Sequence, residues 1–169
     1  METKQVPGYL ETHRTGRLAQ KIRQAYERLE DCTLCPRQCQ VNRLAGETGI
    51  CRTGSQMLVS AAHPHFGEES PLVGRHGSGT IFVTFCNLMC CFCQNYEISH
   101  EGLGEPVSER QAADMMLALQ ARGCHNINVV TPTHVVPQLL SALEKAIDDG
   151  LHIPLVYNCG GYERIETLR

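Results

Sequence analysis

The sequence predicts an α/β fold in which a parallel sheet is covered by helices. Three compact apolar runs, residues 80–85, 126–131 and 153–157, have the length of buried strands. Amphipathic helical patterns at residues 108–122 and 134–149 separate them. Alternation of uninterrupted apolar strands with helices is typical of a parallel sheet.

The N-terminal part follows different patterns. Residues 10–30 place four apolar side chains on one helical face: Leu18, Ile22, Tyr26 and Leu29. Residues 31–54 contain four cysteines without a clear period, which indicates an irregular segment that needs a ligand to hold it. A short strand is expected at 57–62, followed by a loop at 63–78.

Local signals define the helices of the C-terminal part. Ser108 and Gln111 form a capping-box pattern, and Gly123 ends that helix. In the next helix Pro137 falls in the first turn, where it is tolerated, and a further helix is expected to begin within 162–169.

Three strand–helix units are too few to close a barrel. We therefore divide the chain into an N-terminal helix with a Cys-rich extension, residues 1–79, and a core, residues 80–169. Either the sheet is open, or another chain completes it, or the chain is part of a longer protein. We expect the last, because Arg169 falls within an expected helix and no stop signal precedes it.

Composition narrows the function classes. The chain has 169 residues, 10 cysteines and a formal net charge of −3, so nothing favours nucleic acid as a partner. No stretch approaches the roughly 18 apolar residues of a membrane helix, and residues 1–18 lack the apolar core of a secretory signal. We expect a cytoplasmic protein whose reduced thiols are metal or cluster ligands instead of disulfides.

A cysteine motif directly follows the first core strand. Cys86, Cys90 and Cys93 have the spacing C-x3-C-x2-C, and functional groups in α/β folds gather at the carboxyl ends of the strands. Three thiolates can hold three irons of a 4Fe–4S cluster and leave the fourth iron open for chemistry. Alternatively, Cys91 would complete a closed zinc or iron–sulfur site, although adjacent Cys90 and Cys91 are poorly placed to share one metal.

With Phe92 before the last cysteine, this motif resembles that of the radical SAM superfamily. The flanking runs Gly77–Val83 and Cys93–Ser99 are similar to the pyruvate-formate-lyase-activating-enzyme-like branch. The resemblance implies a partial (β/α) barrel, here of about three β/α units. It also implies a 4Fe–4S cluster on the three cysteines and S-adenosylmethionine (SAM) on the open iron, with Phe92 against the adenine. Phe85 departs from the branch, which more often has a small residue there.

The implied activity is that of a radical SAM enzyme. Reductive cleavage of SAM would give a 5′-deoxyadenosyl radical that abstracts hydrogen, and flavodoxin or ferredoxin would supply the electron. An activase-like role would make a glycyl-radical enzyme the protein substrate. The rival reading is a non-catalytic iron–sulfur or zinc-binding module, either a truncated relic or an electron carrier.

The other two strand ends carry further candidates. Instead of the superfamily's common Gly-rich acidic motif, the chain has Val130–His134, where Thr131 and Thr133 would bind SAM. Thr133 is equally a candidate helix N-cap, and His134 has a structural reading as well. Asn158 would face SAM or substrate, whereas Cys159 is better read as an ordinary thiol.

A second cysteine set lies upstream in the irregular segment. Four thiols are the right number for a closed zinc or iron–sulfur site, with unligated thiols as the alternative. Its members are Cys32, Cys35, Cys39 and Cys51.

Overall fold

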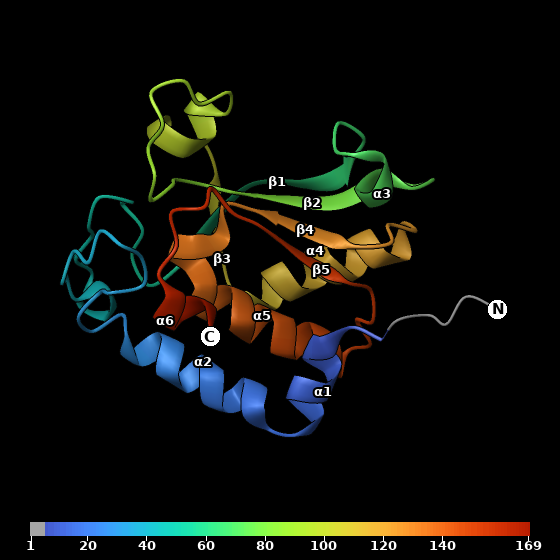
Figure 1. Ribbon diagram of the computed structural model, residues 1–169, viewed down its shortest axis with the longest axis horizontal. Coiled ribbons are helices and arrows are strands. Elements are labelled where there is room, and N and C mark those ends of the chain that lie inside the picture. Colours follow the sequence, from blue (N-terminus) through green and yellow to red (C-terminus); the bar gives the residue numbers. More distant parts are fainter. Residues whose placement is uncertain (1–5) are drawn as a thin grey trace.

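The computed structural model describes residues 6–169 as an α/β fold around one five-stranded sheet (Figure 1). The first five residues of the expected extension, and the start of the stretch expected to lack a signal, lie outside the described residues. The strand order is β3-β1-β2-β4-β5. The strands are β1 (Met57–His65), β2 (Ser78–Val83), β3 (Glu105–Val107), β4 (Ile127–Val130) and β5 (Leu155–Asn158).

The three core strands confirm the sequence prediction. β2 pairs in parallel with β4, and β4 pairs in parallel with β5. The bounds of each strand lie within two residues of those of its apolar run. The runs predict the strands well because a short, uninterrupted apolar run is itself typical of a buried strand. Between them lie α4 (Glu109–Ala121) and α5 (Val136–Asp148), as expected.

The sheet also contains two strands in antiparallel pairing beside the parallel core. β1 pairs antiparallel with both β2 and β3, so the sheet is mixed, and it is open. Between β1 and β2 the chain forms only the four-residue helix α3 (Ser70–Val73). A parallel connection usually runs through a helix that crosses the sheet, whereas the helix in residues 66–77 has only four residues and the chain folds back beside β1. β1 also continues to His65, through residues expected to be loop.

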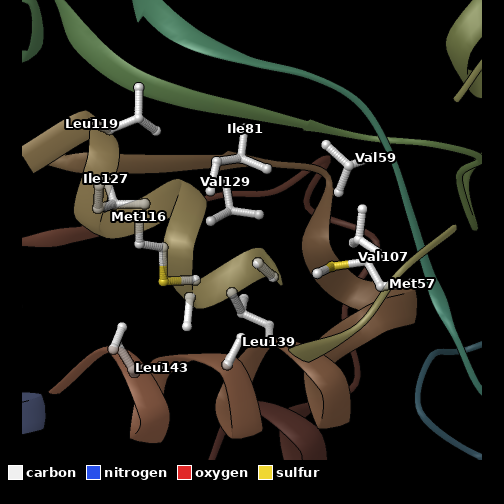
Figure 2. Packing of buried hydrophobic residues seen from close by; sticks show 14 of the residues in the cluster. Met57, Val59, Ile81, Val107, Met116, Leu119, Ile127, Val129, Leu139 and Leu143 are labelled. Carbon is white, nitrogen blue, oxygen red and sulfur yellow. The ribbon is translucent and has the colours of Figure 1, made fainter. Parts of the chain in front are cut away.

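The main core lies between the sheet and one layer of helices. Buried side chains of the strands meet those of α4 and α5 (Figure 2), among them Met57, Val59, Ile81, Ile127, Val129, Met116, Leu119, Leu139 and Leu143. Ser108 accepts a hydrogen bond from the backbone of Gln111, whose side chain accepts one in return, which confirms the capping box of α4.

The N-terminal helix is two helices. α1 (Gly8–Arg14) and α2 (Arg17–Glu27) are separated by Gly16, whose φ of 72° is left-handed and ends the continuous helix expected at 10–30. α2 packs outside α5, which makes a second helical layer (Figure 1).

The Cys-rich segment that follows α2 has little regular structure. Between residues 31 and 54 the only helix or strand is a 3₁₀ turn, η1 (Arg43–Ala45). The division of the chain at residue 79 stays a prediction, although β1 and β2 pair across it.

Three short helices complete the fold. They are η2 (Glu97–Glu101), a π-helical turn, η3 (Pro132–Val135), a 3₁₀ turn before α5, and α6 (Ile165–Leu168). Within residues 6–169, no helix is both long enough and apolar enough to cross a bilayer.

Candidate functional site

The carboxyl ends of β2, β4 and β5 meet at one edge of the sheet because the three strands are parallel. Hydrogen bonds join the loops that follow them. Thr131 N–H donates to Asn158 O (2.8 Å), and the His134 ring Nε2 lies 2.9 Å from Thr84 O. The Asn87 amide donates to Tyr162 O (3.0 Å). These segments therefore form one continuous rim, where the sequence predicts the site.

The loop after β2, residues 85–96, is called the cysteine loop below. Cys86 is buried, Cys90 and Cys93 are half-buried, and Cys91 is exposed. A turn closed by Cys93 N–H to Cys90 O (3.1 Å) draws those two residues together. The loop and η2 project from the sheet edge (Figure 1). Two of the three motif cysteines are thus partly accessible to solvent, and Cys91 is more exposed than any of the three.

Hydrogen-bond donors lie against two motif sulfurs. Leu88 N–H donates to Cys86 Sγ (3.4 Å), and the Ser99 hydroxyl, from η2, donates to Cys93 Sγ (3.3 Å). Hydrogen bonds to the cysteine sulfurs are among the features by which a protein tunes an iron–sulfur cluster. As the side chains stand in residues 6–169, no group of three or more His, Cys, Asp or Glu is arranged to hold a metal ion.

Phe85 adopts an unusual conformation at the start of this loop. Its φ is +66°, and its N–H donates to Ile98 O (3.0 Å). Its ring fills the space beside Gly102, where a Cβ would lie 2.6 Å from a ring carbon. The large side chain that departs from the branch pattern is therefore accommodated by a glycine that follows η2.

The Cys-rich segment braces the cysteine loop. Arg37 donates to Asn87 O (3.1 Å) and to Leu88 O (3.2 Å), and its guanidinium lies 5.5 Å from the centre of the Tyr162 ring. Sequence reasoning missed Arg37 and Asn87. No local pattern marks them, because the contact joins residues about 50 positions apart.

The residues expected to bind SAM differ in their exposure and in their position: two lie at the rim, one is exposed on the cysteine loop and one is buried. Thr131 and Asn158 meet through their backbones at the rim, and Thr131 has a left-handed φ of 52°. Phe92 is 86% exposed. Thr133 is buried, and its hydroxyl hydrogen-bonds to Glu163. Thr133 is also not the N-cap of α5, because that position is Val135.

Glu163 is a rim residue that sequence reasoning missed. Its carboxylate accepts the Thr133 hydroxyl and also the Tyr157 hydroxyl (3.2 Å). Burial, more than this carboxylate, raises the pKa of Tyr157, so the phenol stays protonated and donates. Glu163 thereby joins the loops after β4 and β5.

His134 has a structural role in this arrangement. It is fully buried, and burial lowers its pKa to about 4. A neutral ring with Nε2–H donates to Thr84 O, which fixes the loop after β4 to the end of β2.

The four N-terminal cysteines gather around one cavity. Cys32, Cys35 and Cys51 are buried and Cys39 is half-buried, and Arg43, Asn87 and His134 line the same space. Burial raises the pKa of the Cys35 thiol, while hydrogen bonds from the Arg37 backbone and the Asn87 side chain act in the opposite direction.

His63 and His65 pack by their rings around Phe82, with centroids 5.6 and 5.8 Å from it. Glu68, for which the sequence suggests no role, accepts a hydrogen bond from the buried Asn128 amide (3.1 Å). These contacts tie the 63–78 connection to the sheet face opposite α4 and α5.

Comparison with curated proteins identifies a relative of the chain. The chain is similar to a protein of the archaeon Methanocaldococcus jannaschii that is described as uncharacterised, with 32% identity over 156 residues. The alignment covers 88% of this chain and 44% of that protein, so the chain spans less than half the length of its relative. No protein-family model matches the chain. No solved structure matches it either.

Proposed function

We propose that the chain is part of a radical SAM protein, in which Cys86, Cys90 and Cys93 bind a 4Fe–4S cluster. One observation carries the proposal. The C-x3-C-x2-C motif directly follows β2, the middle strand of the sheet, and lies at the rim where the loops after β4 and β5 also begin. The donors to Cys86 and Cys93 suit a thiolate-bound cluster.

When bound, the cluster would supply the one electron needed to split the sulfonium of SAM into methionine and a 5′-deoxyadenosyl radical. The chain's own residues would bind and orient these groups. Cys86, Cys90 and Cys93 would hold the cluster, and Phe92, on the same loop, would lie against the adenine. Thr131 and Asn158 would bind SAM at the neighbouring strand ends, which the Thr131–Asn158 backbone hydrogen bond and the contact of Thr133 with Glu163 hold together.

The substrate and partners of the longer protein are part of the same proposal. A glycyl-radical enzyme fits an activase-like role, and flavodoxin or ferredoxin fits the need for a one-electron donor in the cytoplasm. Neither is needed for SAM cleavage itself, which a chemical reductant can drive.

The test is anaerobic reconstitution of the chain with iron and sulfide, followed by SAM and dithionite. We expect 5′-deoxyadenosine and methionine in equal amounts, and a cluster spectrum that shifts on addition of SAM. Cys86→Ala, Cys90→Ala and Cys93→Ala should each abolish product. Cys91→Ala is the matched control, because it removes the exposed neighbouring thiol, and it should keep activity.

A well-formed cluster whose spectrum does not change on addition of SAM, and which yields no 5′-deoxyadenosine, would overturn the proposal. That outcome would support the rival function, a non-catalytic iron–sulfur or zinc module.

A further inference from the structure

We propose that Cys32, Cys35, Cys39 and Cys51 form a second metal centre, with thiolate ligands and Arg43 as its buried counter-charge. Its metal binding does not depend on the function proposed above. A second step, that this centre steadies the cysteine loop, does rest on that function.

The first support is convergence. The four cysteines are spread over residues 32–51 of an irregular segment and line one cavity. Gly49 allows the closest approach, since a Cβ there would lie 2.6 Å from Cys39 Sγ. Hydrophobic packing contributes little to the stability of this segment. The small hydrophobic cluster next to it has three buried members, Leu29, Cys32 and Leu34. Segments with so small a core are commonly stabilised by a bound metal ion.

The second support is an uncompensated cation. Arg43 is 1% exposed, and its guanidinium donates to Gly54 O (2.7 and 3.1 Å) and His134 O (2.9 Å). These acceptors are neutral, and no carboxylate in residues 6–169 forms an ion pair with Arg43. Its remaining contact is Cys32 Sγ at 3.9 Å. A buried charge needs an opposite charge, and thiolates around a metal ion supply one.

The third support is the backbone beside the thiols. Gln38, Gln40 and Arg52 flank Cys39 and Cys51, and all three have left-handed φ values of 44°, 56° and 52°. Such residues persist only where the surroundings fix them. Because the thiols are not yet arranged for an ion as they stand, metal binding would draw them together and fix this backbone.

The centre lies next to the cysteine loop. Arg37 falls between Cys35 and Cys39 and holds the Asn87 and Leu88 carbonyls of that loop. Asn87 itself lines the thiol cavity. Metal in the N-terminal set therefore fixes the residue that braces the proposed cluster site.

The test uses the full chain with Cys86→Ala, Cys90→Ala and Cys93→Ala, so that metal at the cysteine loop cannot contribute. After anaerobic purification, iron and zinc are measured by mass spectrometry, and again after separate reconstitution with Zn²⁺ or with iron and sulfide. We expect one zinc or a full iron–sulfur cluster per chain. Adding Cys35→Ala with Cys39→Ala should remove it, whereas adding Cys124→Ala, at a buried thiol outside the set, should not.

A second measurement needs no substitution in the set. In the triple variant, the four thiols should resist alkylation while metal is bound and react after a chelator removes it. The proposal would be overturned if no metal were found after both reconstitutions, or if the thiols were alkylated at the same rate before and after the chelator is added. Neither result bears on SAM cleavage, which is measured with Cys86, Cys90 and Cys93 intact.

Discussion

At the scale of single residues, the buried His134 links stability to pH. Its pKa of about 4 lies below the ordinary value near 6.5 in an unfolded chain, so the unfolded state binds the proton more readily. The contribution of the neutral His134 ring to the free energy of unfolding is complete above pH 6.5 and is lost as the pH falls toward 4. Because the ring is fully buried, the loss amounts to about 3 kcal/mol.

His134→Gln should therefore flatten the dependence of unfolding free energy on pH between 6.5 and 4, as measured by urea denaturation. His152→Gln is the control, since that ring is exposed, and it should leave the slope unchanged. A slope that His134→Gln does not alter would mean that the ring has the same pKa in the folded and unfolded chains, against the lowered pKa expected from burial.

A substitution at Gly49 tests whether the cavity lined by the four N-terminal cysteines binds metal. Gly49→Ala places a Cβ 2.6 Å from Cys39 Sγ and 2.7 Å from Cys39 Cβ, so Cys39 must move. We expect metal affinity at the N-terminal set to fall by about tenfold or more, as for other residues that position ligands. Competition with a chelator measures this. Gly54→Ala is the matched control in the same segment, because its Cβ meets no atom within 4 Å.

At the scale of elements, the cysteine loop depends on the segment that braces it. Arg37→Ala removes two hydrogen bonds to loop carbonyls. Backbone amides of residues 86–96 should then exchange about tenfold faster, which corresponds to about 1.4 kcal/mol. Hydrogen-exchange mass spectrometry measures this, with the exposed Arg75→Ala as control. Equal loop exchange in both variants would show that Arg37 does not brace the loop.

The same elements show what the sequence can predict. The strand at 80–85 and the Ser108 cap carry local signals, and both were predicted correctly. The sequence predicts a strand at 57–62 but not its antiparallel direction, because that depends on how the 66–77 connection returns the chain. Arg37, Arg43 and Glu163 were missed because each acts through partners distant in sequence or on other loops. The three-cysteine motif stays a prediction until its cluster is measured.

At the scale of the whole molecule, the sheet has two unequal edges. β3 is a three-residue edge strand, which limits pairing with another chain. β5 pairs with β4 on one side only and is half-buried along its length. Its outer edge is therefore where a further strand, from a longer chain or from a second copy, would add to the parallel sheet.

Hydrogen exchange distinguishes a free β5 edge from a paired one. In this chain alone, β4 amides should exchange more slowly than β5 amides, because β4 has a strand on each side and β5 has one on a single side. Protection of β5 equal to that of β4 would contradict a free edge. Sedimentation at the same concentration then identifies the cause, because an edge paired with a second copy requires a dimer, whereas a monomer would require another segment of this chain to cover it.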